Sequence, residues 1–392
     1  MFAQTTLFDA SVDLNDIAGS DGFLFVRNGI GYAGRGVAQR VVMSQVEQVL
    51  RDIDHQNTTG IDVSPIAFGV IPFDSTATNE FIIPQQIVGK DENGNCWLTT
   101  IDHADSEVQI RQSLGASSND FAVTALTPIE TYRQAVLGAR SAVREGRITK
   151  AVIAREVVVE ARDPIDVHAV LLRLKATFGN SYRYSIDGFV GASPELLIEV
   201  AGTRVSSHPL AGTTPRTGDP TTDAELARKL LLSMKDQVEH RIVIDVIHDM
   251  LLPYCSYLDW QPEPSVIEVA NVQHLGTLIE GHLSEDHPDL LDLARMLCPT
   301  PALGGHPRDE ALAIISELEG FDRKNYGGAV GWVNAQGDGT WAVAIRCAEF
   351  SADCKTARLI AGGGIVAASE PDAELAETQA KFQAMLSAIV RP

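Results

Sequence analysis

The chain has 392 residues, of which 45% are hydrophobic and 21% charged, as in an ordinary globular protein. Its formal net charge of −21 argues against nucleic acid as a partner, because phosphates are bound by clusters of Lys and Arg. A site for an anion must then be locally positive, so the few basic residues inside it matter. The length admits two or three average domains or one large enzyme with a continuous core.

The five cysteines are odd in number and lack C-x-x-C spacing, which predicts reduced thiols without a disulfide framework or a zinc site. The first residues, Met1 to Asp13, show no basic region followed by an apolar run. Nowhere are 18 consecutive residues apolar. We therefore expect a cytoplasmic protein without a membrane span.

Residues 1–125 predict short strands and turns with no grouping of catalytic side chains. Phe23 to Val26 is followed by Asn28-Gly29, which is a strong hairpin signal. The segment Gly29-Ile-Gly31-Tyr-Ala-Gly34 also matches the G-x-G-x-x-G pattern of dinucleotide sites. That pattern needs a strand before it and a helix after it, and no βαβ unit is evident, so the hairpin is the favoured interpretation. A helix is expected from Gln45 to about Ile53, and strands within 62–74 and 81–84.

The segment from Ile148 to Val159 is rich in β-branched residues and predicts a strand, after a helix from Thr131 to Glu145. Alternation places Lys150 on one face with apolar neighbours. Such a lysine either lies at a strand end in solvent or is partly buried, with a lowered pKa that would let it act as a base.

A helix from Val167 to Phe178 precedes a hairpin at Asp187-Gly188. The next strand is expected to start at Glu195, after a Gly-Ala-Ser turn and Pro194. Glu195 is then either an exposed edge charge or a general acid at the mouth of a sheet. Residues 209–212 predict a further small-residue turn.

A long helix is expected from Asp223 to Leu252, and it carries Asp236 and Glu239 three residues apart on one face. Further along, Arg346 ends an otherwise apolar strand of a hairpin around Gly337 to Gly339. A carboxylate ligand is favoured there over a structural ion pair, because a buried arginine seldom lacks an anionic partner.

The last segment, Ile360 to Lys381, predicts a three-glycine turn followed by a helix that Ser369 caps and Pro371 begins. Glu374, Glu377 and Lys381 share one helical face. They form either a solvated face with an internal Glu–Lys pair or a site for an anion held with a divalent cation. Two such carboxylate faces could together hold one Mg²⁺, which commonly takes one or two carboxylates plus waters.

Many short motifs follow one another between residues 148 and 381. They are Lys150-Ala-Val-Ile-Ala-Arg155, Gly191-Ala-Ser-Pro-Glu195, Pro209-Leu-Ala-Gly212, Lys235-Asp-x-x-Glu239-His240, Pro299-Thr-Pro-Ala-Leu303, Phe321-Asp-Arg323, Gly327-Gly-x-Val-Gly331, Ile345-Arg346 and Ala361-Gly-x-Gly-Ile-Val366. Their order resembles that in the chorismate-utilising enzymes, and the resemblance is closest to isochorismate synthases of the siderophore type. Pro65 to Asp74 extends it into the N-terminal half.

The resemblance implies a single α+β domain over residues 1–392, a large pseudo-symmetric β-sandwich flanked by helices with a deep cleft. Residues 1–125 would form a mostly β half, and residues 126–392 the half that bears the motifs. It also implies a monomer.

By the same resemblance, Lys150 is the general base that activates water for attack at C2 of chorismate, and Glu195 is the general acid for the C4 hydroxyl. Glu239 and Glu377 would bind Mg²⁺, with Asp236 and Glu374 behind them. Anion contacts would come from Arg346, Tyr326, Lys381 and backbone N–H groups at Gly212, Gly362, Gly363 and Gly364. These roles need the pKa of the lysine lowered and that of Glu195 raised.

Within the family, a lysine at position 150 favours water as nucleophile, since the ammonia-using relatives generally show Gln there. Salicylate synthases share the lysine but go on to eliminate pyruvate, and the pair Ala302 and Leu303 resembles the type that releases isochorismate. A non-catalytic protein that binds carboxylates or Mg²⁺ is an alternative of another class, although it would have no need of Lys150 or Glu195. The product could serve siderophore, menaquinone or salicylate synthesis.

Overall fold

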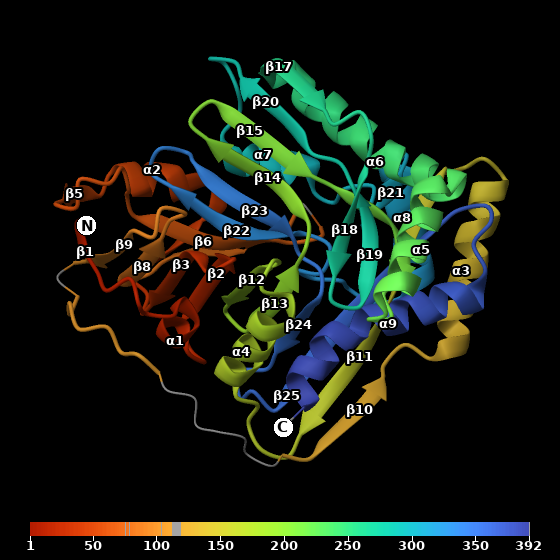
Figure 1. Cartoon of the computed structure of the whole chain (residues 1–392), viewed down its shortest axis with the longest axis horizontal. Helices are drawn as coiled ribbons and strands as arrows, with labels where there is room; N and C mark the ends of the chain where they lie inside the picture. The colour runs from red at the N-terminus through yellow and green to blue at the C-terminus, as the bar shows by residue number, and fades with distance from the viewer. Residues whose placement is uncertain (75, 78, 103, 112–118, 392) are drawn as a thin grey trace.

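The computed structural model describes residues 1–74, 76–77, 79–102, 104–111 and 119–391. Two large sheets and one small sheet make up its centre, and helices lie around them (Figure 1). The helices are α1 (Leu14–Ala18), α2 (Val46–Arg51), α3 (Ile129–Arg144), α4 (Val167–Phe178), α5 (Pro220–Leu232), α6 (Met234–Leu251), α7 (Leu290–Leu297), α8 (Arg308–Glu319) and α9 (Pro371–Val390). Within the described residues, no helix is long and apolar enough to cross a membrane.

In the described residues, the first large sheet has 13 strands, and all its pairings are antiparallel except that of β1 with β5. In sheet order they are β10 (Phe121–Ala125), β11 (Lys150–Ala161), β25 (Thr356–Ile365), β24 (Cys347–Phe350), β13 (Phe189–Ser193), β12 (Tyr182–Ile186), β2 (Phe23–Arg27), β3 (Ile30–Arg35), β8 (Gln86–Lys90), β9 (Cys96–Ile101), β1 (Phe2–Leu7) and β5 (Asp54–Asn57). The two-residue strand β21 (Gly305–His306) pairs with the start of β11, on the edge that faces away from β25.

The second large sheet has nine strands, and the small sheet has three. The nine are β17 (Cys255–Trp260), β20 (Ile279–Leu283), β15 (Arg204–His208), β14 (Leu196–Ala201), β23 (Gly339–Val343), β22 (Ala329–Asn334), β6 (Ile66–Ile71), β7 (Glu80–Ile83) and β4 (Gln39–Val42). The three are β16 (Leu210–Pro215), β19 (Val272–Gly276) and β18 (Ser265–Val269).

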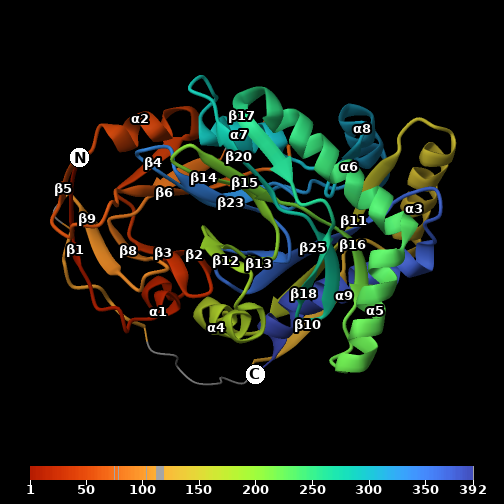
Figure 2. The ribbon, with the colours of Figure 1, turned by 45° about the horizontal axis from the view of Figure 1, so that its top comes forward.

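Both large sheets combine strands from the first 125 residues with strands from the rest of the chain. Strand β12 pairs with β2 in the first sheet, and β22 pairs with β6 in the second. Figure 2 shows the same mixing, with the red and brown N-terminal strands beside green and blue ones. The fold is therefore α+β with one continuous arrangement of sheets, as the sequence predicted.

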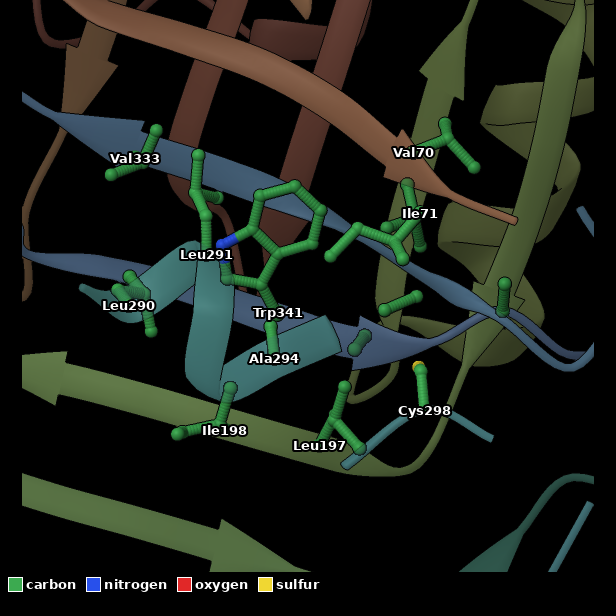
Figure 3. Packing of buried hydrophobic residues seen from close by; sticks show 14 of the residues in the cluster. Val70, Ile71, Leu197, Ile198, Leu290, Leu291, Ala294, Cys298, Val333 and Trp341 are labelled. Carbon is green, nitrogen blue, oxygen red and sulfur yellow. The ribbon is translucent and has the colours of Figure 1, made fainter. Parts of the chain in front are cut away.

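The indole of Trp341 lies at the centre of the largest apolar cluster and is fully buried. Leu291 and Ala294 of α7 lie near it, as does Ile71 of β6 (Figure 3). Because α7 packs on β14 and β22, this cluster holds the helix against the nine-stranded sheet. Removing such area from water is the main driving force that fixes these elements together.

Several local predictions are confirmed. Asn28 and Gly29 have φ values of 54° and 80° and join β2 to β3 as an antiparallel hairpin. The G-x-G-x-x-G segment is therefore part of that hairpin, without the helix that a dinucleotide site requires. Helix α4 has the predicted bounds, and Asp187-Gly188 forms the turn between β12 and β13. The five cysteines are free thiols.

Three predicted turns are wrong, because tertiary pairing recruits the segments into strands. The three glycines at 362–364 belong to β25, which pairs with β11 along its length. The Gly-Ala-Ser segment at 191–193 belongs to β13 in the same sheet. Residues 210–212 are also a strand, β16, whose pairing is irregular at Gly212 with φ of 73°.

The long predicted helix from Asp223 is two helices, α5 and α6, separated by Ser233. The Ser233 hydroxyl accepts a hydrogen bond from the Asp236 N–H at 3.3 Å and so caps α6. Ser369, predicted to cap α9, instead accepts from the Val366 N–H, and Glu370 stands at the N-cap without a side-chain bond. Pro371 begins α9 as predicted.

Candidate active site

A cleft of about 550 Å³, its open mouth included, lies where the chain passes from one large sheet to the other. Glu195 stands between β13 of the first sheet and β14 of the second. Arg346 stands between β23 of the second sheet and β24 of the first. The Ala192 N–H donates to the Arg346 carbonyl at 3.1 Å, so the two crossings are neighbours. Both residues thus lie at the points where the chain leaves one large sheet and enters the other.

Most of the residues singled out from the sequence line this cleft. They are Lys150, Glu195, Gly212, Glu239, Ala302, Leu303, Tyr326, Arg346, Gly362, Gly364, Glu377 and Lys381. The remaining lining consists of Val152, Pro194, Leu210, Ala211, Thr213, His274 and Ile345. Residues far apart in the sequence are thereby brought to one site.

Lys150 begins β11 and is buried, with 1% of its side chain exposed. Its Nζ atom lies 2.7 Å from Oε1 of Glu239 on α6. A Cβ atom at Gly364 of β25 would lie 2.7 Å from that carboxylate oxygen and 2.8 Å from Cε of Lys150. Glycine at 364 therefore leaves room for this ion pair.

Glu195 is 2% exposed, and its Oε1 accepts a hydrogen bond from the Leu210 N–H at 3.3 Å. Burial raises the pKa of its carboxyl to about 7, against the opposing effects of that N–H and of Lys150 and Arg346. The carboxyl can therefore carry a proton near neutral pH, which is what a general acid requires.

Arg346 is buried, with φ of 52°, and it has no carboxylate ion-pair partner among the described residues. Its Nη2 donates to Nε2 of His274 at 3.2 Å, and its Nε has no hydrogen-bond partner in the described part of the chain. Burial, Arg346 and Lys381 lower the pKa of His274 to about 3. A buried guanidinium with a free donor is suited to an anionic ligand.

The sequence gives no role to His274, which stands between Gln273 and Leu275 without a recognisable motif. Its Nδ1 lies 3.2 Å from the Gly212 carbonyl, which can only accept, so Nδ1 carries the proton and Nε2 accepts from Arg346. His274 thus orients the guanidinium. Only the pairing of β16 with β19, which joins distant segments, brings it to the cleft.

Four carboxylates converge from α6 and α9. Burial raises the pKa of Asp236, and the negative charges of Glu239 and Glu377 act in the same direction. Burial and Glu377 raise the pKa of Glu374 to about 7, and its buried Oε2 has no hydrogen-bond partner among the described residues. Asp236 and Glu374 lie outside the cleft lining.

The carboxylate donor set suits a hard divalent cation such as Mg²⁺, and the buried Oε2 of Glu374, without a hydrogen-bond partner in the described residues, adds a further acceptor oxygen beside it. In the described part of the chain, no three His, Cys, Asp or Glu side chains are grouped as a ready metal site. Mg²⁺ needs fewer protein ligands than three, because it usually takes one or two carboxylates and completes its shell with water and substrate.

Gly363 differs from Gly362 and Gly364 in the direction of its backbone groups. The Gly362 carbonyl accepts from Nζ of Lys381 at 2.7 Å, so residue 362 faces the edge of β25 away from β11. Alternation turns the Gly363 backbone toward Ile153 of β11, and Gly363 does not line the cleft. Its predicted N–H contact to an anion is therefore not available in this structure. A Cβ there would meet Glu374 Oε2 at 2.7 Å.

The chain is similar to known proteins over most of its length. The chain is 35% identical over 338 residues to isochorismate synthase DhbC of Bacillus subtilis, covering 83% of this chain and 81% of the relative. It is 38% identical over 339 residues to a putative isochorismate synthase MenF of Mycobacterium tuberculosis, covering 83% and 87%.

The crystal structure of a putative 2,3-dihydroxybenzoate-specific isochorismate synthase, DhbC from Bacillus anthracis, superposes with a TM-score of 0.81 at 32% identity. The match covers 97% of this chain and 98% of that one. The family model for chorismate binding enzymes matches residues 34–390. The chain therefore belongs to the chorismate binding enzyme family.

Proposed function

We propose that the protein converts chorismate to isochorismate by adding water at C2 with loss of the C4 hydroxyl. One observation carries the proposal: Lys150 and Glu195 line the same cleft as Arg346, a buried cation that lacks an anionic partner in the described residues. The relatives described above bear the name isochorismate synthase, which supports the same reaction.

The positive charges of the cleft match the substrate. Chorismate carries two carboxylates, whereas the protein carries a net charge of −21, so local cations have to attract it. Arg346 would receive the enolpyruvyl carboxylate with the hydroxyl of Tyr326 nearby, and the Lys381 ammonium would add a second anion contact. Desolvated cations held in place before substrate arrives are the most effective form of electrostatic stabilisation.

Proton transfer would divide between Lys150 and Glu195. Lys150 takes a proton from water, whose oxygen forms the new bond at C2. Glu195 gives its proton to the hydroxyl that leaves C4, so one water enters and one departs. To act as the base, Lys150 must be a neutral amine, and its ion pair with Glu239 must therefore give way when the site is loaded.

Glu239 and Glu377 would hold Mg²⁺, with Asp236 and Glu374 behind them. When bound, the ion would neutralise and orient the ring carboxylate of the substrate. Glu377 is paired with Lys381 at 2.6 Å, as Glu239 is with Lys150. A divalent cation at these oxygens would compete with both ion pairs.

The full-length protein incubated with chorismate and Mg²⁺ tests the proposal, with products separated by chromatography. Isochorismate as the sole product is the expected result. Salicylate with an equal amount of pyruvate would replace the proposal by salicylate synthesis. Chorismate binding without any product would instead indicate a non-catalytic binding protein.

A further inference from the structure

Among the described residues, the edge of β11 opposite β25 has no neighbouring strand in its middle. Strand β21 pairs only with Lys150 and Ala151, and the Val152 N–H then donates to the Gly304 carbonyl at 2.8 Å. Strand β10 pairs with β11 from Val157 onward. Between these points, the backbone groups of Val152 and Ala154 need other partners, because buried polar groups are costly when unpaired.

A buried ion pair between Glu319 and Arg323 supplies them. Oε1 of Glu319 accepts from the Ala154 N–H at 2.6 Å, and Nη2 of Arg323 donates to the Val152 carbonyl at 2.6 Å. Their side chains are 1% and 2% exposed, and Nε of Arg323 donates to Oε2 of Glu319 at 2.8 Å. The two side chains thus continue the hydrogen bonding of the sheet where the strand is missing.

The same guanidinium also reaches the loop that precedes β21 and lines the cleft beside β11. Its Nη1 donates to the Leu303 carbonyl at 2.7 Å, while its face lies 4.4 Å from the ring centre of Phe73. Val152 and Leu303 both line the cleft. Arg323 therefore binds the backbone carbonyls of two segments that line the cleft, although it does not line the cleft itself. Its planar guanidinium, with several donors in fixed directions, is suited to this role.

We infer that Arg323, held by Glu319, is a positioning residue for the reaction. It sets the distance between β11, which carries Lys150, and the loop that carries Ala302 and Leu303. Lysine at 323 would keep the positive charge and the pair with Glu319. It would lose the fork that holds both carbonyls at once. The inference rests on the proposed function, since the groups to be positioned are those of the chorismate reaction.

The test compares Arg323→Lys with the wild-type protein, measuring kcat and KM for chorismate with saturating Mg²⁺ well below the unfolding temperature. Expected is a fall in kcat/KM of about 10- to 100-fold, the scale on which small misplacements of reacting groups act, with kcat reduced and cooperative unfolding retained. Wild-type kcat and KM in a variant that is merely less stable would overturn the inference.

Arg183→Lys is the matched control. Arg183 is 1% exposed, donates to Oδ1 of Asn15 at 2.6 Å and does not line the cleft. This variant is expected to lose stability with unchanged kcat and KM. An equal loss of kcat in the control would show a general effect of buried-arginine replacement and would also overturn the inference.

If Arg323→Lys does not fold, Glu319→Gln tests the positioning role of Arg323 instead. The amide keeps an acceptor for the Ala154 N–H and removes only the charge that holds the guanidinium. A lowered kcat supports the inference, and a normal kcat and KM contradicts it. Inactivity of the wild-type protein toward chorismate would refute the proposed function instead, so the two failures are distinguishable.

Discussion

Nζ of Lys150 lies 2.7 Å from Oε1 of Glu239, although 89 residues separate them in the sequence. The proposed base and a proposed metal ligand are thus partners in one buried ion pair. Binding of a cation and release of the lysine are expected to be linked, because the same oxygen cannot hold both fully.

Lys150→Gln should reduce kcat by about 10²- to 10⁴-fold, the usual contribution of a positioned general base. The amide still donates to Glu239, so the fold should survive, as circular dichroism and thermal unfolding would show. Lys229→Gln serves as control, since that side chain is 64% exposed in an i,i+4 pair with Glu225. Near-normal turnover in Lys150→Gln would remove Lys150 from its proposed role.

The pH dependence of kcat/KM should carry a falling limb that belongs to Glu195. Its pKa is raised from 4.5 to about 7 by burial, so the proton that it would donate is lost as pH rises through about 7. In Glu195→Gln, the remaining activity should be lower by about 10²- to 10⁴-fold and should lack this limb. A limb that persists in the variant would assign it to another group.

Glu195 should also make stability depend on pH. A carboxyl with a raised pKa binds its proton more tightly in the folded state, so its stabilising contribution is complete below about pH 4.5. That contribution is lost as pH rises through about 7, on the order of 3 kcal/mol in total. Urea unfolding at several pH values should show a smaller loss over this range in Glu195→Gln, and equal losses would contradict the assignment.

Arg346→Lys should raise KM for chorismate and lower kcat/KM by about 10- to 100-fold, since a charged hydrogen bond contributes about 1.5–3 kcal/mol. The ammonium keeps the charge but not the planar donors that face the cleft and His274. Arg358→Lys, which changes the ion pair with Glu156 outside the cleft lining, should leave both constants unchanged. Unaltered KM in Arg346→Lys would exclude its carboxylate contact.

Glu239→Gln and Glu377→Gln should each weaken Mg²⁺ binding by about 10-fold or more in calorimetric titration, because a carboxylate ligand becomes a neutral amide. Chelation of Mg²⁺ should abolish turnover of the wild-type protein, and its return should restore it. Glu370→Gln, at a surface pair with Arg140, should bind Mg²⁺ normally. Undiminished affinity in both site variants would place the ion elsewhere.

Much of the local structure could be predicted because its causes are local. The turn at Asn28-Gly29 needs residues that tolerate positive φ, and the bounds of α4 follow from apolar periodicity over 167–178. The glycines at 362–364 were assigned to a turn for the same local reason. They form a strand because β11 pairs with them and because side chains from other elements fill the space beside them.

The active site, like the fold, could be predicted from the sequence only in part. Sequence motifs selected nearly all of the charged side chains that line the cleft, and they missed His274 and the tie between Glu319 and Arg323. Arg323 belongs to a matched motif and stands four residues after Glu319, but the contacts of this pair and of His274 depend on which strand edge or carbonyl lies opposite in space.

By itself, the sequence determined which chemical groups the protein possesses and that they occur in the order of the chorismate-utilising enzymes. Tertiary structure alone decided that Glu195 and Arg346 sit where the chain changes sheets, and that Lys150 faces Glu239. The physical reason is that burial and pairing depend on neighbours remote in sequence. These neighbours raise the pKa of Glu195 and leave a donor of Arg346 free for an anion.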